Sequence, residues 1–286
     1  MTRAVTGTGT GTVTGTVAVL SDIHGMSGPL DQVLAEPAVA SADLVLVTGD
    51  HTWGPEPAEV LDRLVGLDDR ALLIRGNADR ELLQMSRGVD VGLDDDPVSV
   101  WGAGQLRPDH QRLLDRMPEQ LTVEIDGFGT VLFCHATPRD DQEVVLVDSR
   151  IERWQEVFAD VPPSVSTVVC GHTHMPFVRL AAGRTVVNPG SVGLPYGRTG
   201  AHWALLHEGA VTLRRTPLDR EEVIRETARR SALPGVEQWL DDYVRRPADD
   251  VEALETFGPR DGRRPSSTEE DRGAHGPLGE GGGPRR

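Results

Sequence analysis

The chain alternates between short apolar runs and polar loops that begin directly after them. Residues 17–20, 44–47 and 71–74 form runs of the length expected for strands that are covered on both faces. Between these runs, apolar residues recur at helical spacing over 30–34 and 57–67. This β-α-β-α-β order predicts a parallel sheet with right-handed crossover connections.

The second half of the chain has shorter apolar runs that are joined by glycine turns. Residues 121–125 and 130–133 flank Asp126-Gly127-Phe128-Gly129, which is typical of a β-hairpin. Further short strands are expected at 177–180, 185–187, 203–206 and 211–213, which predicts a second, mainly antiparallel sheet region. Helical spacing predicts helices over 110–117, 150–158, 220–230 and 236–243.

Composition changes at both ends of the chain. Residues 1–16 are almost entirely threonine and glycine, so we expect a flexible leader there. From about residue 258 to residue 286 almost nothing is apolar, which predicts a disordered tail. The folded domain is therefore expected over residues 17–245.

The chain is acidic, with 45 Asp and Glu residues against 29 Lys and Arg residues and a formal net charge of −16 over 286 residues. This charge disfavours a general nucleic-acid or anionic-membrane binder. No apolar run approaches the roughly 18 residues of a membrane span, and no signal-peptide pattern is present. The two cysteines are too few for a disulfide framework. We therefore expect a cytoplasmic protein with reduced thiols.

Polar residues with metal-binding side chains follow five of the apolar runs directly. In Val168-Val169-Cys170-Gly171-His172-Thr173-His174, two imidazoles stand two residues apart, a spacing that places both on one side of an extended chain. In open α/β sheets, ligands bind beyond the carboxyl ends of the strands, where these residues are expected. The full set is Asp22, His24, Asp50, Asn77, His135, His172 and His174.

This set contains two carboxylates, one amide and four imidazoles, but no thiolate. Oxygen and imidazole ligands suit Mn²⁺, Fe²⁺, Ni²⁺ or Zn²⁺ better than Ca²⁺. Each residue alone has an ordinary explanation, such as a helix cap for Asp22 or a turn for Asn77, but chance rarely places all seven at strand ends. Seven ligands exceed the needs of one ion, so we expect two ions that share one aspartate. Two-metal sites activate water and bind phosphate oxygens.

The motifs SDIHG, GDHTWGPEP, GNAD, CHATP and GHTH occur in this order and resemble the five motifs of calcineurin-like metallophosphoesterases. The loop NPGSVG, residues 188–193, is similar to one in the small bacterial branch of phosphodiesterases and phosphatases in that family. The resemblance spans roughly residues 17–215. It implies an α/β fold in the form of a four-layer αββα sandwich with mixed β-sheets.

The resemblance also implies roles for the seven residues. The first metal ion would be held by Asp22, His24 and His174. The second would be held by Asn77, His135 and His172. Asp50 would bridge the two ions, of which Mn²⁺ is the first candidate and Fe, Ni or Zn the others. The implied reaction is attack of a metal-bridging hydroxide on phosphorus, with Asp50, Asn77 and His135 as catalytic residues.

One position departs from the family pattern. Many relatives have histidine after the asparagine of the third motif, where it assists the leaving oxygen, and this chain has Ala78. His51 is a possible substitute, with Asn77 and Arg139 as further substrate contacts, although Arg139 also fits a surface ion pair. Asp79 is expected to act in catalysis by orienting a ligand or a water molecule.

The resulting prediction is a metal-dependent phosphoric ester hydrolase for a phosphodiester or phosphomonoester of a small molecule or nucleotide. Two alternatives stay open on the sequence alone. One is a catalytically weak or inactive metal-binding scaffold of the same fold, and the other is a nuclease, which the acidic charge disfavours. A homo-oligomer is compatible with the hydrolase and with both alternatives.

Overall fold

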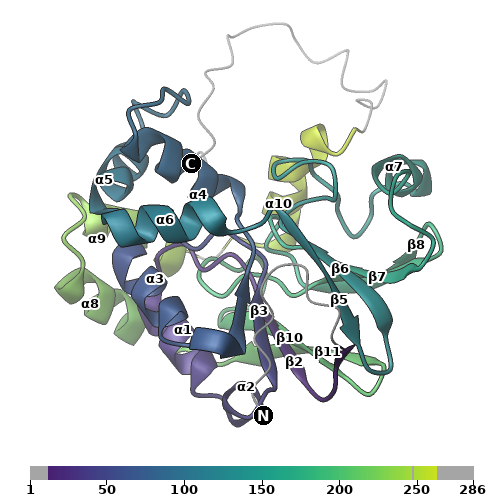
Figure 1. The fold of residues 1–286 in the computed structure, drawn as a ribbon. Helices are drawn as coiled ribbons and strands as arrows, with labels where there is room; N and C mark the ends of the chain where they lie inside the picture. The colour runs from purple at the N-terminus through teal and green to yellow at the C-terminus, as the bar shows by residue number, and fades with distance from the viewer. Residues whose placement is uncertain (1–11, 247, 263–286) are drawn as a thin grey trace, which may run out of the picture.

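A computed structural model describes residues 12–246 and 248–262, in which two mixed β-sheets pack face to face between outer layers of helices (Figure 1). This arrangement is the four-layer αββα sandwich with mixed β-sheets that the sequence predicts. The predicted leader and tail fall mostly on residues 1–11 and 263–286, outside the described residues.

The first sheet has the strand order β11-β10-β2-β3-β4. Its strands are β2 (Val17–Leu20), β3 (Leu44–Val47), β4 (Ala71–Leu73), β10 (Ala201–His207) and β11 (Ala210–Thr216). The strands β2, β3 and β4 are parallel, as their β-α-β-α-β order predicts. Every residue of β2 and β3 is buried, because both faces of the sheet are covered.

The second sheet has the order β1-β5-β6-β7-β9-β8. Its strands are β1 (Thr12–Val13), β5 (Gln120–Ile125), β6 (Gly129–Cys134), β7 (Val165–Val169), β8 (Phe177–Ala181) and β9 (Arg184–Asn188). The predicted hairpin is the antiparallel pair β5 and β6. The strands β6, β7 and β9 are parallel neighbours.

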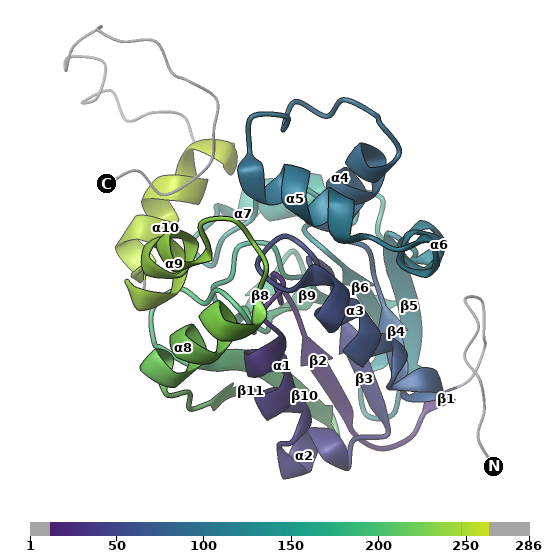
Figure 2. The same cartoon turned by 90° about the vertical axis from the view of Figure 1, so that its left-hand side faces the viewer.

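Helices cover the outer face of each sheet, and apolar side chains fill the three spaces between the four layers. The helices α1 (Ser27–Leu34), α2 (Pro37–Ala40) and α3 (Pro57–Val65) pack on the first sheet (Figure 2). Between the sheets, Val19 and Leu46 meet Val131 and Phe133. The helix α7 (Ile151–Val157) packs on the second sheet through Trp154.

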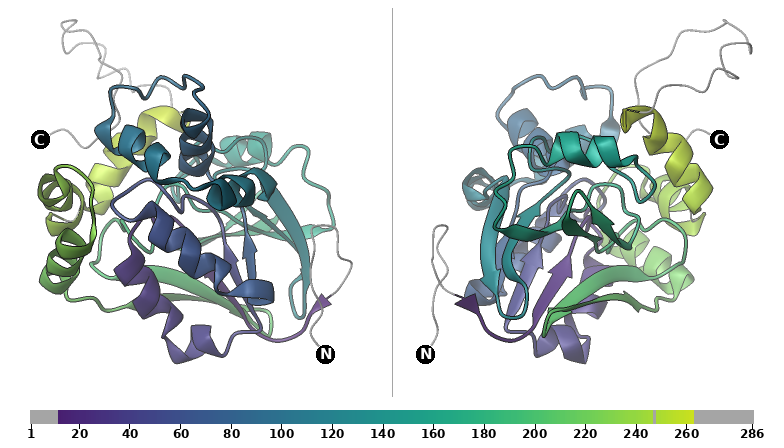
Figure 3. Two further views of the ribbon diagram at one scale, coloured as in Figure 1. Left: turned by 60° about the vertical axis from the view of Figure 1, so that its left-hand side comes forward. Right: turned by 90° about the vertical axis from the view of Figure 1, so that its right-hand side faces the viewer.

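Six further helices occur in the described residues. They are α4 (Asn77–Ser86), α5 (Pro97–Gln105), α6 (Pro108–Arg116), α8 (Arg220–Arg230), α9 (Val236–Leu240) and α10 (Asp250–Phe257). The short turns η1 (Asp68–Arg70), η2 (Asp241–Arg245) and η3 (Gly258–Arg260) complete the set. Figure 3 shows α10 at the same end as α4 and α5, away from the N-terminal strand. No helix in the described ranges is long and apolar enough to cross a membrane.

The sequence is wrong about the second sheet, which is not a separate, mainly antiparallel region. The strands β8 and β9 extend the sheet of the predicted hairpin, whereas β10 and β11 join the first sheet through an antiparallel pairing of β10 with β2. Turn residues identify a hairpin, but the pairing of its outer edge depends on contacts that are distant in the sequence.

Both predicted domain boundaries are also displaced. Thr12 and Val13, assigned to the flexible leader, pair with Glu124 and Ile125. At the other end, the predicted tail begins too early, because residues 258–260 form η3 and Asp261 is buried. The Asp261 carboxylate accepts a hydrogen bond from Ser149 Oγ at 3.0 Å, which fixes this segment on the folded domain.

Candidate metal centre

The seven predicted ligands meet at one edge, where strands of both sheets end. Asp22 and His24 follow β2, Asp50 follows β3, and Asn77 begins α4 shortly after β4. His135 directly follows β6, and His172 and His174 follow β7. Because parallel strands end at the same edge, the topology brings together residues that are up to 152 positions apart in the sequence.

Five of the seven residues have a left-handed backbone. The φ angles are 53° at Asp22, 51° at His24, 53° at Asp50, 64° at His172 and 57° at His174. A non-glycine residue in this region costs roughly 1–2 kcal/mol, and such residues concentrate at functional sites. The surrounding core must therefore hold these turns in place. Gly76 shows how tight the site is, because a Cβ atom there would lie 2.2 Å from Asp50 Oδ1.

Asp22, His24 and His174 form the first group of ligand atoms. The Nε2 atoms of His24 and His174 face each other at 3.0 Å, and His174 Nε2 lies 3.3 Å from Asp22 Oδ1. Asp22 Oδ1 is buried and has no hydrogen-bond partner among the described residues. Such an atom is costly unless a partner satisfies it. A divalent cation between these three side chains would do so.

Asp50, His135 and His172 form the second group, and Asn77 adjoins it. Asn77 Oδ1 lies 3.2 Å from His135 Nε2. If the Asn77 amide is rotated by 180°, its NH₂ group instead donates to His135 Nε2 and His172 Nδ1, both at 3.2 Å. The amide therefore faces imidazole nitrogens that could themselves hold a metal ion. A cation held by Asp50, His135 and His172 would favour the orientation in which the Asn77 amide oxygen faces these residues.

Asp50 lies between the two groups. Its Oδ2 atom is 3.3 Å from His135 Nε2 and 3.8 Å from His24 Nε2. Its Oδ1 atom accepts a hydrogen bond of 2.9 Å from the backbone N–H of Ala78. One carboxylate oxygen is thus fixed by the start of α4, and the other faces histidines of both groups. A carboxylate in this position could be shared by ions held in the two groups.

Backbone carbonyls orient three of the histidines. The Nδ1 atoms of His24, His135 and His174 lie 3.2, 2.8 and 2.7 Å from the carbonyl oxygens of Trp53, Thr48 and Leu194. A carbonyl can only accept, so each Nδ1 carries the proton and donates it. In the neutral imidazole each Nε2 therefore presents its lone pair to the site, as in metal-binding histidines.

The ionisable side chains of the centre shift one another's pKa values. Burial raises the pKa of a carboxyl group, but the surrounding histidines outweigh this at Asp22 and Asp50, so both pKa values lie below the usual range. Burial lowers the pKa of a histidine, but Asp50 outweighs this at His135 and raises its pKa to about 10. Burial, together with the positive charges of His135 and Arg260, lowers the pKa of His172 to about 3.

Asp79 lies behind the centre, contrary to a direct catalytic role. Its carboxylate is fully buried and accepts hydrogen bonds from His51 Nδ1 at 2.7 Å, Thr52 Oγ1 at 2.9 Å and Gly76 N–H at 3.0 Å. It also accepts the His51 backbone N–H at 2.9 Å. With these contacts Asp79 ties the loop after Asp50 to the start of α4, so it positions the ligands rather than contacting a substrate.

Two predicted substrate contacts are not placed for that role. His51 is fully buried against Asp79, so its side chain is not on the surface of the site. Arg139 pairs with Glu143 and, at 3.1 Å, with Glu156, which is the surface ion pair that the sequence left open. Asn77 alone of the three predicted contacts lies at the centre.

Aromatic side chains flank the centre, and of these only Trp53 lies within one of the sequence motifs. The Trp53 ring centroid is 5.8 Å from that of His24, the Tyr196 centroid is 6.0 Å from that of His174, and the Phe257 centroid is 5.8 Å from that of His172. Phe257 belongs to α10, beyond the end of the predicted domain. No motif connects it to the histidines.

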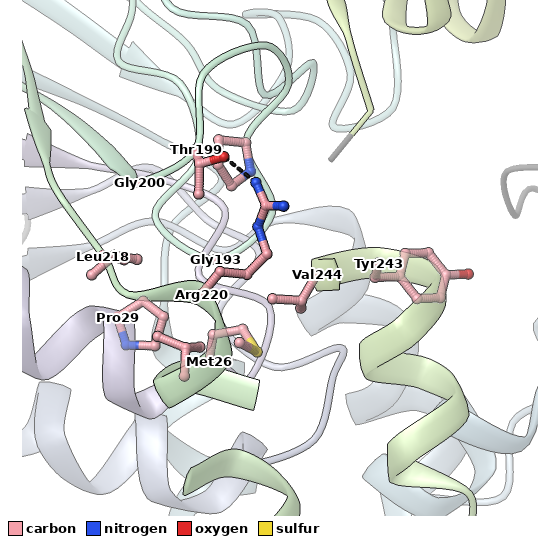
Figure 4. A pocket seen from close by; sticks show the side chains of 11 residues that line it. Met26, Pro29, Gly193, Thr199, Gly200, Leu218, Arg220, Tyr243 and Val244 are labelled. Carbon is pink, nitrogen blue, oxygen red and sulfur yellow. Dashed lines mark hydrogen bonds between the residues drawn. The ribbon is translucent and has the colours of Figure 1, made fainter. Parts of the chain in front are cut away.

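Two other features lie outside the centre. A pocket between α1, α8 and η2 is lined by Met26, Arg220 and Tyr243 among others, and Arg220 donates a hydrogen bond to Thr199 there (Figure 4). It includes none of the seven ligands. The cysteines Cys134 and Cys170 are buried and unlinked.

Comparison with known proteins supports the same interpretation. The family model described as "Calcineurin-like phosphoesterase superfamily domain" matches residues 16–210. An uncharacterised protein of Methanocaldococcus jannaschii is 26% identical over 200 residues, which cover 63% of this chain and 76% of that protein. The phosphodiesterase YfcE of Escherichia coli is 26% identical over 217 residues, which cover 73% of this chain and 95% of that protein.

Solved structures share the fold. A hypothetical protein of Pyrococcus horikoshii has a TM-score of 0.68 at 18% identity, covering 82% of this chain and 100% of that one. A metallophosphoesterase of Sphaerobacter thermophilus has a TM-score of 0.62 at 23% identity, covering 79% of this chain and 98% of that one. Together with the family match over 16–210, the motifs and their convergence at one edge, these findings show that the chain belongs to the calcineurin-like phosphoesterase superfamily.

Proposed function

We propose that this protein is a phosphoesterase that uses two divalent cations, with Mn²⁺ as the first candidate, to hydrolyse a phosphodiester or phosphomonoester of a small molecule or nucleotide. The observation that carries the proposal is the position of Asp50, whose Oδ2 lies 3.8 Å from His24 Nε2 and 3.3 Å from His135 Nε2. The similarity to a protein named as a phosphodiesterase supports action on diesters.

The donor set fits such a pair of cations. Asp22, His24 and His174 would hold one ion, and Asn77, His135 and His172 the other. Asp50 would be shared between them. When bound, the two cations supply a water molecule of lowered pKa and neutralise charge on the phosphate oxygens.

The chain's own residues keep this centre in one geometry. The carbonyls of Trp53, Thr48 and Leu194 fix the histidine tautomers, and Ala78 N–H holds one oxygen of Asp50. The methyl group of Ala78 cannot donate a proton to a leaving oxygen. We therefore propose that substrates with acidic leaving groups are favoured, since a general acid typically contributes about 10²–10⁴ in rate.

The test begins with the metal content of the purified protein, followed by hydrolysis of bis-p-nitrophenyl phosphate with added Mn²⁺. Asp50→Asn should abolish hydrolysis and reduce the bound metal. Asp68→Asn is the matched control, because Asp68 also has a left-handed backbone, with φ of 51°, but is exposed and outside the centre. No bound metal and no Mn²⁺-stimulated hydrolysis would refute the proposal.

A separate outcome distinguishes the scaffold alternative. If the protein binds two metal ions per chain at the seven residues but hydrolyses no phosphate ester, the centre is structural and the chemistry is absent. A panel of nucleotides and sugar phosphates, measured with Mn²⁺, Fe²⁺, Ni²⁺ and Zn²⁺, identifies the substrate if the first assay is positive.

A further inference from the structure

A C-terminal segment that lies beyond the family match forms one wall of the metal centre. The match ends at residue 210, whereas α10 and η3 span Asp250–Phe257 and Gly258–Arg260. Ala253 and Phe257 pack with Val144, Leu146 and Met175 in one apolar cluster. Met175 directly follows the ligand His174. The segment is therefore attached to the loops that carry the ligands.

Arg260 stands at the rim of the second group of ligands. Its guanidinium carbon is 5.9 Å from the centroid of the Phe257 ring, and that ring is 5.8 Å from the His172 ring. Arg260 Nη2 donates a hydrogen bond of 3.2 Å to the carbonyl of Gln142. The carbonyl of the preceding residue, Asp141, lies 3.3 Å from the amide of Asn77. The Phe257 ring and the Gln142 carbonyl thus place Arg260 beside the second group of ligands.

No carboxylate of the described residues pairs with Arg260, unlike its arginine neighbours. Arg80 bonds Asp141 at 2.7 Å, Arg153 bonds Glu143 at 2.9 Å, and Arg139 also pairs with Glu143. Arg260 is exposed, and its contacts are a carbonyl oxygen and an aromatic face. Within the described ranges, no carboxylate lies within 4.0 Å of its guanidinium. In a chain of net charge −16, such a cation can bind an anion.

The position of Arg260 indicates which part of a substrate it can reach. The printed contacts of Arg260 are with the Gln142 carbonyl and the Phe257 ring and with none of the seven ligands, so we place it beside a phosphate bound between the two ligand groups. We propose that Arg260 binds a second anionic group on the substrate, which selects phosphate esters whose alcohol part carries a further phosphate or carboxylate. This inference rests on the proposed function, because it assumes that the first phosphate binds at the metal centre.

The test compares the affinities of two matched pairs of ligands for the Mn²⁺-loaded protein by isothermal titration calorimetry. Thymidine 3′,5′-bisphosphate and thymidine 5′-phosphate differ by one phosphate, and 3-phosphoglycerate and glycerol 3-phosphate differ by one carboxylate. The wild-type protein should bind the doubly charged member of at least one pair about tenfold more tightly, as expected for a charge-assisted hydrogen bond. The pair that shows the effect tells whether the second group is a phosphate or a carboxylate.

Arg260→Gln should remove this preference, and Arg260→Lys should retain part of it. Arg70→Gln is the matched control, because Arg70 is also exposed and bonds only carbonyl oxygens, those of Val39 and Ala40, but lies just before β4 at the opposite end of the sheet. It should leave the preference intact. Thermal unfolding of each variant checks that the fold is retained.

The inference is overturned if the wild-type protein does not discriminate within either pair, or if Arg260→Gln discriminates as well as wild type. It is also overturned if Arg260→Gln weakens both members of a pair equally, since that would indicate a structural role. Failure of the proposed function gives a different pattern. In that case the charge preference and its loss in Arg260→Gln are observed, but no phosphate ester is hydrolysed.

Discussion

Two clusters of aspartate and histidine in this protein have similar composition and different properties. One is the metal centre at the carboxyl edge of the sheets. The other is a surface cluster, defined here as Asp62, Asp109 and His110, whose possible ligand atoms also lie within 4.8 Å of one another. In the surface cluster, Arg107 bonds Asp109 at 3.1 Å and pairs with Asp62 as well. A cation is therefore already present there.

The metal centre has no such neutralising arginine. The cationic partners within 4.0 Å of Asp22 and Asp50 are histidines in the part of the chain that the structure describes. Asp22 Oδ1 and His172 Nε2 are buried without hydrogen-bond partners there, and five ligands have a left-handed backbone. The surface cluster instead belongs to the helices α3 and α6. Proximity of ligand atoms is thus a weak criterion, and so is a single unsatisfied buried atom, because His110 Nδ1 of the surface cluster also lacks a hydrogen-bond partner among the described residues. The left-handed backbone of five residues and the lack of a pairing arginine distinguish the centre.

The largest effect that would test this comparison is expected from Asp50. Asp50→Asn removes the charge that lies between the two groups, so hydrolysis of bis-p-nitrophenyl phosphate should fall by more than the roughly 10–100-fold that is typical of residues behind a metal site. Asp109→Asn, which removes the same charge from the surface cluster, should leave kcat/KM unchanged. Equal losses in both variants would contradict the distinction.

The next effect separates the two halves of the centre. His174→Ala should weaken the ion held with Asp22 and His24, and His172→Ala the ion held with Asn77 and His135. Metal titration of each variant should show one binding step retained and the other weakened, because Asp50 and the opposite group remain intact. Loss of both ions to the same extent in each variant would argue against the division.

A smaller effect is expected from Asp79, which holds loops and touches no ligand atom. Asp79→Asn should lower metal affinity by about 10–100-fold, the range for residues that orient metal ligands. Metal affinity is measured directly by competition with a chelator. Unchanged metal affinity, with only a lower unfolding temperature, would leave Asp79 with a purely structural role.

The smallest effect concerns the surface cluster itself. Hydrogen bonding to Arg107 lowers the pKa of Asp62 to about 2. Because the folded-state pKa lies below the unfolded value, the stability that this carboxylate contributes is present above about pH 4 and is lost as pH falls toward 2. Asp62 is exposed, so the contribution is at most about 1 kcal/mol.

Urea unfolding at pH 5 and pH 3 should therefore differ slightly less in Asp62→Asn than in wild type, by at most about 1 kcal/mol. The metal content of this variant should equal that of wild type. A loss of bound metal in Asp62→Asn would show that the surface cluster is itself a metal site.

The sequence predicts the seven candidate ligands because each of them lies shortly after a strand. Apolar runs of four residues identify β2 and β3, and the polar residues directly after them, such as Asp22 and Asp50, are placed by the topology of parallel strands. The parallel part of the first sheet follows from the same local pattern. The local sequence pattern identifies the site because the candidate ligands lie in the loops at the carboxyl ends of the strands.

Other features depend on packing between distant segments and leave no local signal. His51 follows a ligand in a polar loop, so the sequence favours an exposed residue, yet its Nδ1 lies 2.7 Å from Asp79 Oδ2 and its ring is fully buried. Phe257 and Arg260 reach the centre through contacts with Leu146 and Gln142, more than a hundred positions away. Their segment is polar enough to resemble the start of a tail.

The central claim is that two cations bind with Asp50 between them. It is tested most directly by anomalous diffraction at the manganese edge from crystals soaked in Mn²⁺. We predict two peaks about 3.5–4 Å apart on either side of Asp50 Oδ2, one near His24 and His174 and the other near His135 and His172, with none at the surface cluster. A single peak, or a peak at Asp62 and none at Asp50, would contradict the account.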